Sequence, residues 1–459
     1  MNILKKTRAL FVTAVASGTM LNPLNSSMIS LALHSIQKDF QLSFTTVSWL
    51  ISSFYLASAV AQPVTGKIGD IFGRKKTFLF GLALVALSAL GAPLSTTFLM
   101  LLVMRLVQSI GSSAIYPSGM ALIRDHIKER QASALAVLSI FASAMVALGP
   151  TIGGFLIVWG NWPAIFWVNF PFVIISFILG WTMFPKDVKK DKDTIKKLFS
   201  HLDFLGIGLF AFGMVFFLWF LLSFEEKVHY LSGIAGIIFF LLFIFLELRV
   251  KEPFIDVKIF KSHPKLTLVY VQFIILNIYF YCLFFGLPSY FQEVMGLSVE
   301  KSGLMMLFMS GVSIIISTVT GKWVDKSGVN KPVIVGAGIS VIGGLLFTFF
   351  FVGASYFLIG LILAIMGLSY GIGNVVLQVA MLNESPKPII GTTSGLFQTC
   401  RYLGSIFSSI ILGLIFGEEI SAEKMIIIGE VLIVTGLVSF FMSLWFSRGR
   451  IVTLKIKRA

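Results

Sequence analysis

The feature that most constrains this chain is a series of long apolar runs separated by short charged segments. A membrane-spanning helix needs about 20 mostly apolar residues to cross the hydrocarbon layer of a bilayer. Fourteen runs reach that length, and we expect each to form one spanning helix. They cover roughly residues 8–31, 46–66, 77–95, 98–121, 133–157, 163–184, 204–223, 229–248, 266–291, 301–321, 332–352, 355–379, 391–416 and 425–446.

The composition points to a bilayer rather than water. Of 459 residues, 57% are hydrophobic and only 12% are charged, whereas a soluble protein carries roughly 25% charged residues. The chain is therefore expected to be an all-α polytopic membrane protein. Cys282 and Cys400 both lie inside apolar runs, without His or Cys neighbours at metal-binding spacing. We expect no disulfide framework, no metal and no cofactor.

The basic residues gather on one side of the predicted spans. Thirty of the 36 Lys and Arg residues, counting Arg8 at the border of the first run, lie in alternate connections, whereas Lys38, Lys227, Lys301 and Lys424 lie in the others. The basic connections are 1–7, 67–76, 122–132, 185–203, 249–265, 322–331, 380–390 and 447–459. Basic loops stay in the cytoplasm, so we expect both termini there. The net charge of +15 then reflects orientation and contact with anionic membrane lipids, and no nucleic-acid partner is expected.

A charged turn occurs twice in the chain, at an offset of 255 residues. The segment 66–76 reads GKIGDIFGRKK, and 321–331 reads GKWVDKSGVNK. The first turn follows the second run and its counterpart follows the tenth, so the two turns are eight runs apart. A duplicated six-helix bundle would place them six runs apart, which leaves two additional runs between the halves. The sequence therefore predicts two related six-helix bundles with two inserted helices.

The predicted domains follow from this grouping. They are an N-terminal bundle (1–184), a linker (185–203), two inserted helices (204–248), a second linker (249–265), a C-terminal bundle (266–446) and a basic tail (447–459).

The first turn resembles the loop between helices two and three of the major facilitator superfamily, Gly-x-Leu-x-Asp-Arg-x-Gly-Arg-Lys. Ile68 stands in place of the Leu and Ile71 in place of the first Arg. The resemblance implies a major facilitator fold and an inner gate in which Asp70, Arg74 and Asp125 form a charge cluster. We assign gating roles also to Gly66, Gly73 and Asp325, which is the counterpart of Asp70 in the repeat. A plain positive turn is the alternative.

The fifth run carries Gly149-Pro150-Thr151-Ile152-Gly153-Gly154. It resembles the Gly-Pro-x-x-Gly-Gly signature of the antiporters of this superfamily, which implies export. We expect Gly149, Pro150 and Gly153 to let this helix bend and pack against the second half. An ordinary kinked helix is the alternative.

Further segments are similar to the fourteen-helix drug:proton antiporter branch. They are 24–33, 161–169 and 252–256. This resemblance implies drug export coupled to protons. One position departs from it: the branch has an Asp in the first span where this chain has Asn25, which cannot carry a proton. No Asp or Glu lies near the centre of any predicted span. The proton-coupling candidates are therefore carboxylates near span ends, with Glu293 first, followed by Glu247 and Glu430.

Polar side chains inside the apolar runs form the predicted substrate site. Arg105 and Gln108 lie in a run that resembles the Leu-x-x-x-Arg-x-x-Gln-Gly-x-Gly motif of the superfamily. A charged residue inside a span faces protein or water and marks a functional site. Helix–helix hydrogen bonds are the alternative for each residue. The full set is Asn22, Asn25, Tyr55, Arg105, Gln108, Asn277, Tyr281, Asn374, Gln378, Gln398 and Arg401.

Together these observations predict a multidrug efflux transporter of the bacterial cytoplasmic membrane, driven by proton antiport with alternating access. Its partners would be an amphiphilic small molecule, protons and lipids. An exporter of an endogenous metabolite or lipid-like product is the first alternative. A non-transporting receptor or scaffold is the second. No hydrolase, metalloprotease or phosphate-loop motif is present, so we expect no enzyme.

Overall fold

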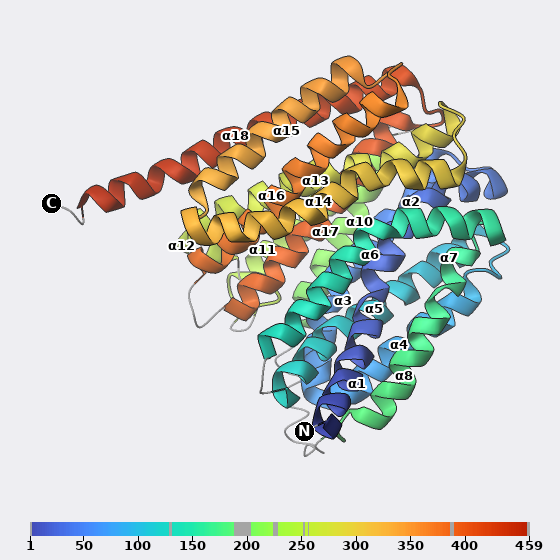
Figure 1. The fold of residues 1–459 in the computed structure, drawn as a ribbon, viewed down its shortest axis with the longest axis vertical. Coiled ribbons are helices and arrows are strands. Elements are labelled where there is room, and N and C mark those ends of the chain that lie inside the picture. The colour runs from blue at the N-terminus through green and yellow to red at the C-terminus, as the bar shows by residue number, and fades with distance from the viewer. Residues whose placement is uncertain are drawn as a thin grey trace. The chain divides into compact units, whose positions relative to one another are not determined.

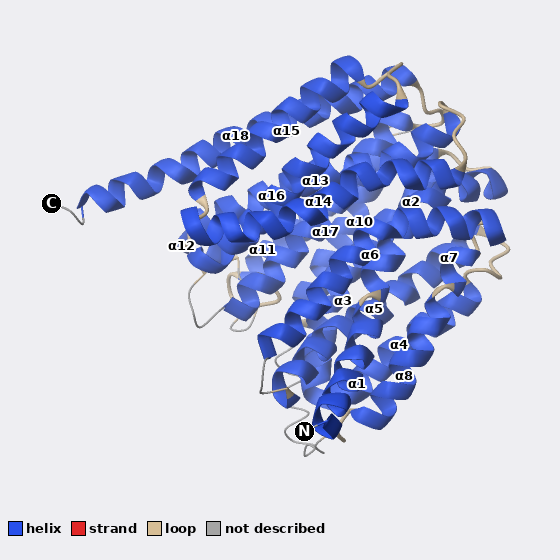
Figure 2. Ribbon diagram, viewed as in Figure 1, coloured by secondary structure: helices blue, strands red, loops and turns tan. Residues whose placement is uncertain are grey.

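A computed structural model describes residues 2–127, 131–187, 203–223, 228–250, 253–255, 257–385 and 390–456. Within these ranges all regular structure is helical, without a strand (Figure 2). An α-helix satisfies its backbone hydrogen bonds within one segment, which is what a chain in lipid requires. The helices follow the apolar runs of the sequence for this reason.

The chain forms two compact units. The first comprises residues 1–42 and 49–256, and the second comprises 43–48 and 257–459. Helix α3 (Phe44–Phe72) begins within the short piece assigned to the second unit and continues in the first. The helix pair α10 (Phe204–Leu222) and α11 (Tyr230–Glu247) groups with the first unit. The domain boundaries given above stay a prediction.

Figure 1 labels the helices along the chain. The first group is α1 (Asn2–Thr19), α2 (Leu21–Phe40), α3 (Phe44–Phe72), α4 (Arg74–Gly91), α5 (Phe98–His126), α6 (Gln131–Gly160), α7 (Ala164–Trp167), α8 (Asn169–Met183), α10 (Phe204–Leu222) and α11 (Tyr230–Glu247). The second group is α12 (Lys258–Ser262), α13 (Pro264–Glu293), α14 (Val299–Ser327), α15 (Asn330–Phe350), α16 (Tyr356–Glu384), α17 (Ile390–Phe416) and α18 (Ala422–Ile456).

Eleven helical segments in the described ranges are long and apolar enough to span a membrane. They account for eleven of the fourteen predicted runs. The other three runs coincide with α1 and α2, with α4 and with α6. The first run is broken at Met20 and α2 is rich in Asn and Ser, while α4 opens with three basic residues. The count of fourteen spans therefore stays a prediction.

Two segments expected to connect or follow the spanning helices are themselves helical in the structure. The charged turn expected at 67–76 is almost entirely helical, because α3 continues to Phe72 and α4 starts at Arg74. The tail expected from residue 447 continues the last helix, since α18 ends at Ile456.

The duplication in the sequence is present in the backbone. Helices α3 and α14 each have 29 residues, and their first and last residues are offset by 255. Each is followed by a glycine with positive φ, Gly73 at +110° and Gly328 at +71°. Helices α5 and α16 also have 29 residues each, and hydroxyl caps start both, from Thr97 and Ser355. These pairs are equivalent elements of two repeats.

Small residues set the closest helix contacts in each unit. In the first, Gly81 of α4 and Gly111 of α5 lie against each other's backbone. In the second, Gly367 of α16 lies against the backbone of α14 at Met309, and Gly344 of α15 against α18. Such contacts let helices approach closely in a medium where apolar side chains gain little from leaving lipid.

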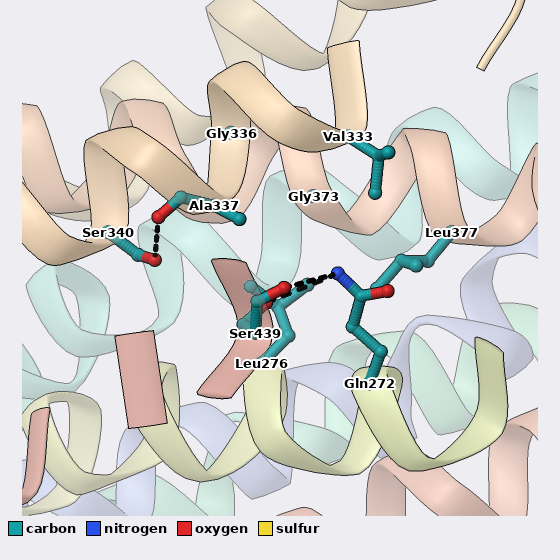
Figure 3. Close-up of a pocket in the computed structure, with 9 residues that line it drawn as sticks. All are labelled: Gln272, Leu276, Val333, Gly336, Ala337, Ser340, Gly373, Leu377 and Ser439. Atoms are coloured by element: carbon teal, nitrogen blue, oxygen red, sulfur yellow. Dashed lines mark hydrogen bonds between the residues drawn. The ribbon is translucent and has the colours of Figure 1, made fainter. Parts of the chain in front are cut away.

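A small cavity of about 10 Å³ lies between α13, α15, α16 and α18, roughly the room that one water needs. Gln272 of α13 points its amide nitrogen across to α18 (Figure 3). It donates to Ser439 Oγ at 3.3 Å and to Ser443 Oγ at 2.6 Å. This polar link joins α13 and α18.

Candidate functional site

The turn between α3 and α4 is built around Gly73. Its φ of +110° is unfavourable for any residue with a Cβ. Arg74, the first residue of α4, forms an ion pair with Asp125 near the end of α5. The same guanidinium donates to Ala121 O at 3.2 Å. The predicted link between Arg74 and Asp125 is thus present, whereas the side chains of Asp70 and Asp325 lie outside the described residues.

Asp187, which follows α8, stabilises this turn by hydrogen bonds to the start of α4. The sequence analysis did not identify this residue. Its carboxylate accepts from the backbone N–H of Lys75 and of Lys76, both at 3.0 Å, and so caps α4. Lys75 Nζ donates to Trp181 O at 2.6 Å and to Phe184 O at 2.8 Å, at the end of α8. The available signal was an acidic residue just after an apolar run. Asp187 lies inside the segment 185–203, which the sequence analysis assigned only as a linker.

The glycines of α6 lie against α2 within the first unit, and the expected packing of α6 against the second half stays a prediction. A Cβ on Gly149 would lie 2.6 Å from Ser27 Cβ, and one on Gly153 would lie 3.2 Å from Met28 Cβ. Both neighbours belong to α2. Ser27 Oγ also donates to Met145 O at 3.1 Å. Gly149 and Gly153 therefore allow α6 to lie close to α2, since larger side chains at these two positions would have no space.

Four buried side chains form a hydrogen-bonded network inside the first unit. Asn25 Nδ2 donates to Asn169 Oδ1 at 2.6 Å, and Asn169 Nδ2 donates to Asn25 Oδ1 at 2.9 Å. Gln108 Nε2 also donates to Asn25 Oδ1, at 3.1 Å. Arg105 Nη1 donates to Gln108 Oε1 at 2.6 Å and to Asn25 O at 3.3 Å. The network joins α2, α5 and α8.

Arg105 is the charged centre of this network. Its side chain is buried, and its guanidinium carbon lies 4.2 Å from the centroid of the Phe54 ring. Among the described residues, its Nε and Nη2 atoms have no hydrogen-bond partner. Burial of a cation without a full set of partners is costly. The group is therefore suited to bind a carboxylate or a carbonyl that reaches it.

Two more predicted residues lie near this network. Asn22 Nδ2 donates to Ser112 Oγ at 3.0 Å, between α2 and α5. Tyr55 is buried, with its ring edge-on to Phe54 at 5.8 Å. Asn169 is the residue that the sequence analysis left out of the site, although it ends a quoted motif. Its position inside the predicted run 163–184 was the available signal, as it was for the other polar residues of the site.

The second unit has a looser polar group. Tyr370 OH donates to Asn277 Oδ1 at 3.3 Å. Arg401 Nη2 donates to Asn374 Oδ1 at 3.2 Å, and its guanidinium carbon lies 5.5 Å from the Phe273 ring. Tyr370 was not predicted, because a single aromatic residue in an apolar run gives no signal. Three further members of the predicted set differ in exposure: Tyr281 is buried, Gln398 half-buried and Gln378 exposed.

The three candidate proton carriers differ in burial. Glu293, at the end of α13, is half-buried, and Glu430, on α18, is exposed. Glu247, the last residue of α11, is buried. Of the three, Glu247 has the environment that most penalises an ionised carboxylate.

The polar groups around Arg105 and Arg401 are amides, hydroxyls and guanidinium groups. Within the described residues, no three His, Cys, Asp or Glu side chains gather as a metal site would require. Such groups can bind a ligand by hydrogen bonds and charge.

Comparisons with known proteins bear on the whole chain. A family model described as Major Facilitator Superfamily matches residues 15–409. The uncharacterized MFS-type transporter YwoD of Bacillus subtilis (strain 168) is 64% identical over 443 residues, covering 96% of this chain and 98% of YwoD.

More distant relatives have named functions. The tetracenomycin C resistance and export protein of Streptomyces glaucescens is 26% identical over 415 residues, covering 89% of this chain and 76% of that protein. The multidrug transporter protein MdtP of Bacillus subtilis (strain 168) is 26% identical over 423 residues, covering 90% and 76%.

Solved structures share the fold at low sequence identity. A bacterial homologue of the human lysosomal transporter Spinster matches with a TM-score of 0.70 at 14% identity, covering 96% of this chain and 98% of that one. A D-xylose-proton symporter matches with a TM-score of 0.68 at 13% identity, covering 95% and 96%. With the family model and the relative at 64% identity, these matches show that the chain is a membrane transporter belonging to the Major Facilitator Superfamily.

Proposed function

We propose that this transporter is a multidrug exporter of the fourteen-helix drug:proton antiporter branch, in the bacterial cytoplasmic membrane with both termini inside. The observation that carries the proposal is the buried network around Arg105, which joins three helices of one unit. A charged side chain buried inside a spanning helix costs free energy, so such residues are rare and by default mark a functional site. Two relatives with named roles, the tetracenomycin C exporter and MdtP, support export of organic molecules.

The cargo is proposed to be amphiphilic and neutral, zwitterionic or carboxylate-bearing. A permanent dication needs a buried acid as a partner. This chain has Asn25 where the branch has an acid, and it offers the guanidinium groups of Arg105 and Arg401. An anionic or zwitterionic group is the matching ligand for them.

An efflux assay tests both the proposed cargo and the proposed function as a drug exporter. Cells that lack other drug pumps are loaded with a zwitterionic fluoroquinolone or a bis-quaternary ammonium dye, and retention is followed with and without an uncoupler. We expect faster, uncoupler-sensitive loss of the zwitterion. Stronger export of the dication overturns the cargo proposal. If neither compound is exported while a lipid-like cell product accumulates outside, the metabolite exporter is correct. No transport of any compound favours the receptor or scaffold.

The inner gate is proposed to consist of Asp70, Arg74 and Asp125. The ion pair of Arg74 with Asp125 supports it. We expect Asp70→Asn to lose most transport at normal membrane expression. Glu419→Gln, the same charge change at an exposed residue beyond α17, is the control and should transport normally. Near-normal efflux by Asp70→Asn contradicts this gate.

Proton coupling is proposed to use a carboxylate near a span end. The solved D-xylose-proton symporter has the same fold, so the fold is compatible with proton coupling. Glu293, Glu247 and Glu430 are replaced by Gln one at a time. Uncoupler-sensitive efflux should be abolished in at least one variant. If all three keep it, the proton binds elsewhere.

A further inference from the structure

Two carboxyl groups meet where the inserted helices α10 and α11 come together. Asp203 is the N-cap of α10, and its Oδ1 accepts from Gly206 N at 2.7 Å. Glu247 ends α11, and its Oε2 accepts from Ile255 N at 3.2 Å. One oxygen of each group is thus satisfied by backbone. The site lies wholly within the first unit.

The other two oxygens are aimed at each other. Asp203 Oδ2 and Glu247 Oε1 are both buried, and no N–H or O–H group of the described residues donates to either. The side chains are within hydrogen-bonding reach of each other. Gly206 makes this approach possible, because a Cβ at that position would collide with both oxygens.

No described cation neutralises the pair. Glu247 has 0% of its surface exposed, and among the described residues Asp203 is the charged group that acts on it. Arg249 stacks on Phe245, with its guanidinium carbon 3.9 Å from the centroid of that ring. The segment 253–255, which packs on Glu247 through Ile255 N, carries no titratable side chain.

Two ionised carboxylates in this position would repel strongly in a medium that screens them little. A hydrogen bond between two carboxyl groups requires that one of them keeps its proton. We propose that Asp203 and Glu247 hold one proton between them, which makes the inserted helix pair a proton-binding site. The pair shares the proton as a unit, so neither residue alone is its carrier.

The shared proton forms a hydrogen bond between the start of α10 and the end of α11. The backbone N–H of Ile255, which follows α11, donates to the same Glu247 carboxyl group. Loss of the proton would leave two facing negative charges and force the groups apart. Because the folded chain holds a proton that the unfolded chain releases at neutral pH, its stability should fall as the pH rises. This inference holds whether or not the chain exports drugs.

Infrared spectroscopy on the purified full-length protein tests the site directly. We expect the C=O stretching band of a protonated carboxyl group to persist at neutral pH. The band should be lost in Glu247→Gln and equally in Asp203→Asn, since one amide in place of either partner supplies the missing donor. Glu419→Gln, at an exposed acid outside the helices, should keep the band.

Thermal unfolding gives a second readout. The midpoint of the wild-type protein should fall from mildly acidic to mildly alkaline pH more than that of Glu247→Gln, which carries a pH-independent donor. Absence of the band at neutral pH, or its survival in both single variants, overturns the proposal. A sodium-dependent rise of the wild-type midpoint without the band would show that the pair holds a cation instead, which also overturns it.

Discussion

At the scale of single residues, Asn25 shows how one departure from a family pattern changes a site. An Asp at this position would pair with Arg105 by charge. The amide of Asn25 accepts from Gln108 and both donates to and accepts from Asn169. This position therefore has a neutral side chain that hydrogen-bonds to two others, in place of an acid that could carry a proton. The positive charge of Arg105 is not neutralised by it and can pair with a ligand.

We expect Asn25→Ala to destabilise the protein by about 1–3 kcal/mol, because it leaves buried groups of Gln108 and Asn169 without partners. Asn22→Ala is the matched control: it removes one half-buried hydrogen bond and should cost about 1 kcal/mol or less. Thermal unfolding in detergent measures both. An equal loss in the two variants would show that the network around Asn25 adds nothing beyond one ordinary bond.

At the scale of elements, the two repeated turns differ in what surrounds them. Gly73 and Gly328 both have positive φ, so alanine should cost about 1–3 kcal/mol of backbone strain at either position. Only at Gly73 would the new Cβ also collide with a neighbour, the Asp187 side chain. Gly73→Ala should therefore be the more destabilising variant in thermal unfolding. A larger loss from Gly328→Ala would contradict this account of the turn.

The glycine face of α6 gives another test. Gly149→Ala should cost about 1–3 kcal/mol, because its Cβ has no space beside Ser27. Gly311→Ala on α14 is the control. No atom lies within 4 Å of its Cβ, and removing a helical glycine stabilises by about 0.5–1 kcal/mol. Midpoints of thermal unfolding that fall equally would argue against close packing of α6 on α2.

The sequence predicted elements better than contacts. Apolar length placed the eleven segments that are long and apolar enough to span a membrane within a few residues, and the 255-residue offset predicted equivalent turns, because hydrophobic patterning and turn chemistry act locally. It did not predict that Asn169 pairs with Asn25, or that Asp203 meets Glu247, because these partners are 144 and 44 residues apart. The contact of the α6 glycines with α2 was not predicted for the same reason, because a run of small residues does not indicate which helix packs against it.

At the scale of the whole molecule, the central claim is export driven by a proton gradient. The most direct measurement uses the purified protein in liposomes, with a pH gradient imposed across the membrane and a zwitterionic amphiphile as cargo. The account predicts that the gradient drives the cargo against its own concentration gradient, that cargo in turn moves protons in the opposite direction, and that an uncoupler abolishes both fluxes. Cargo movement that only follows its own concentration gradient, unchanged by the pH gradient and by the uncoupler, would contradict it.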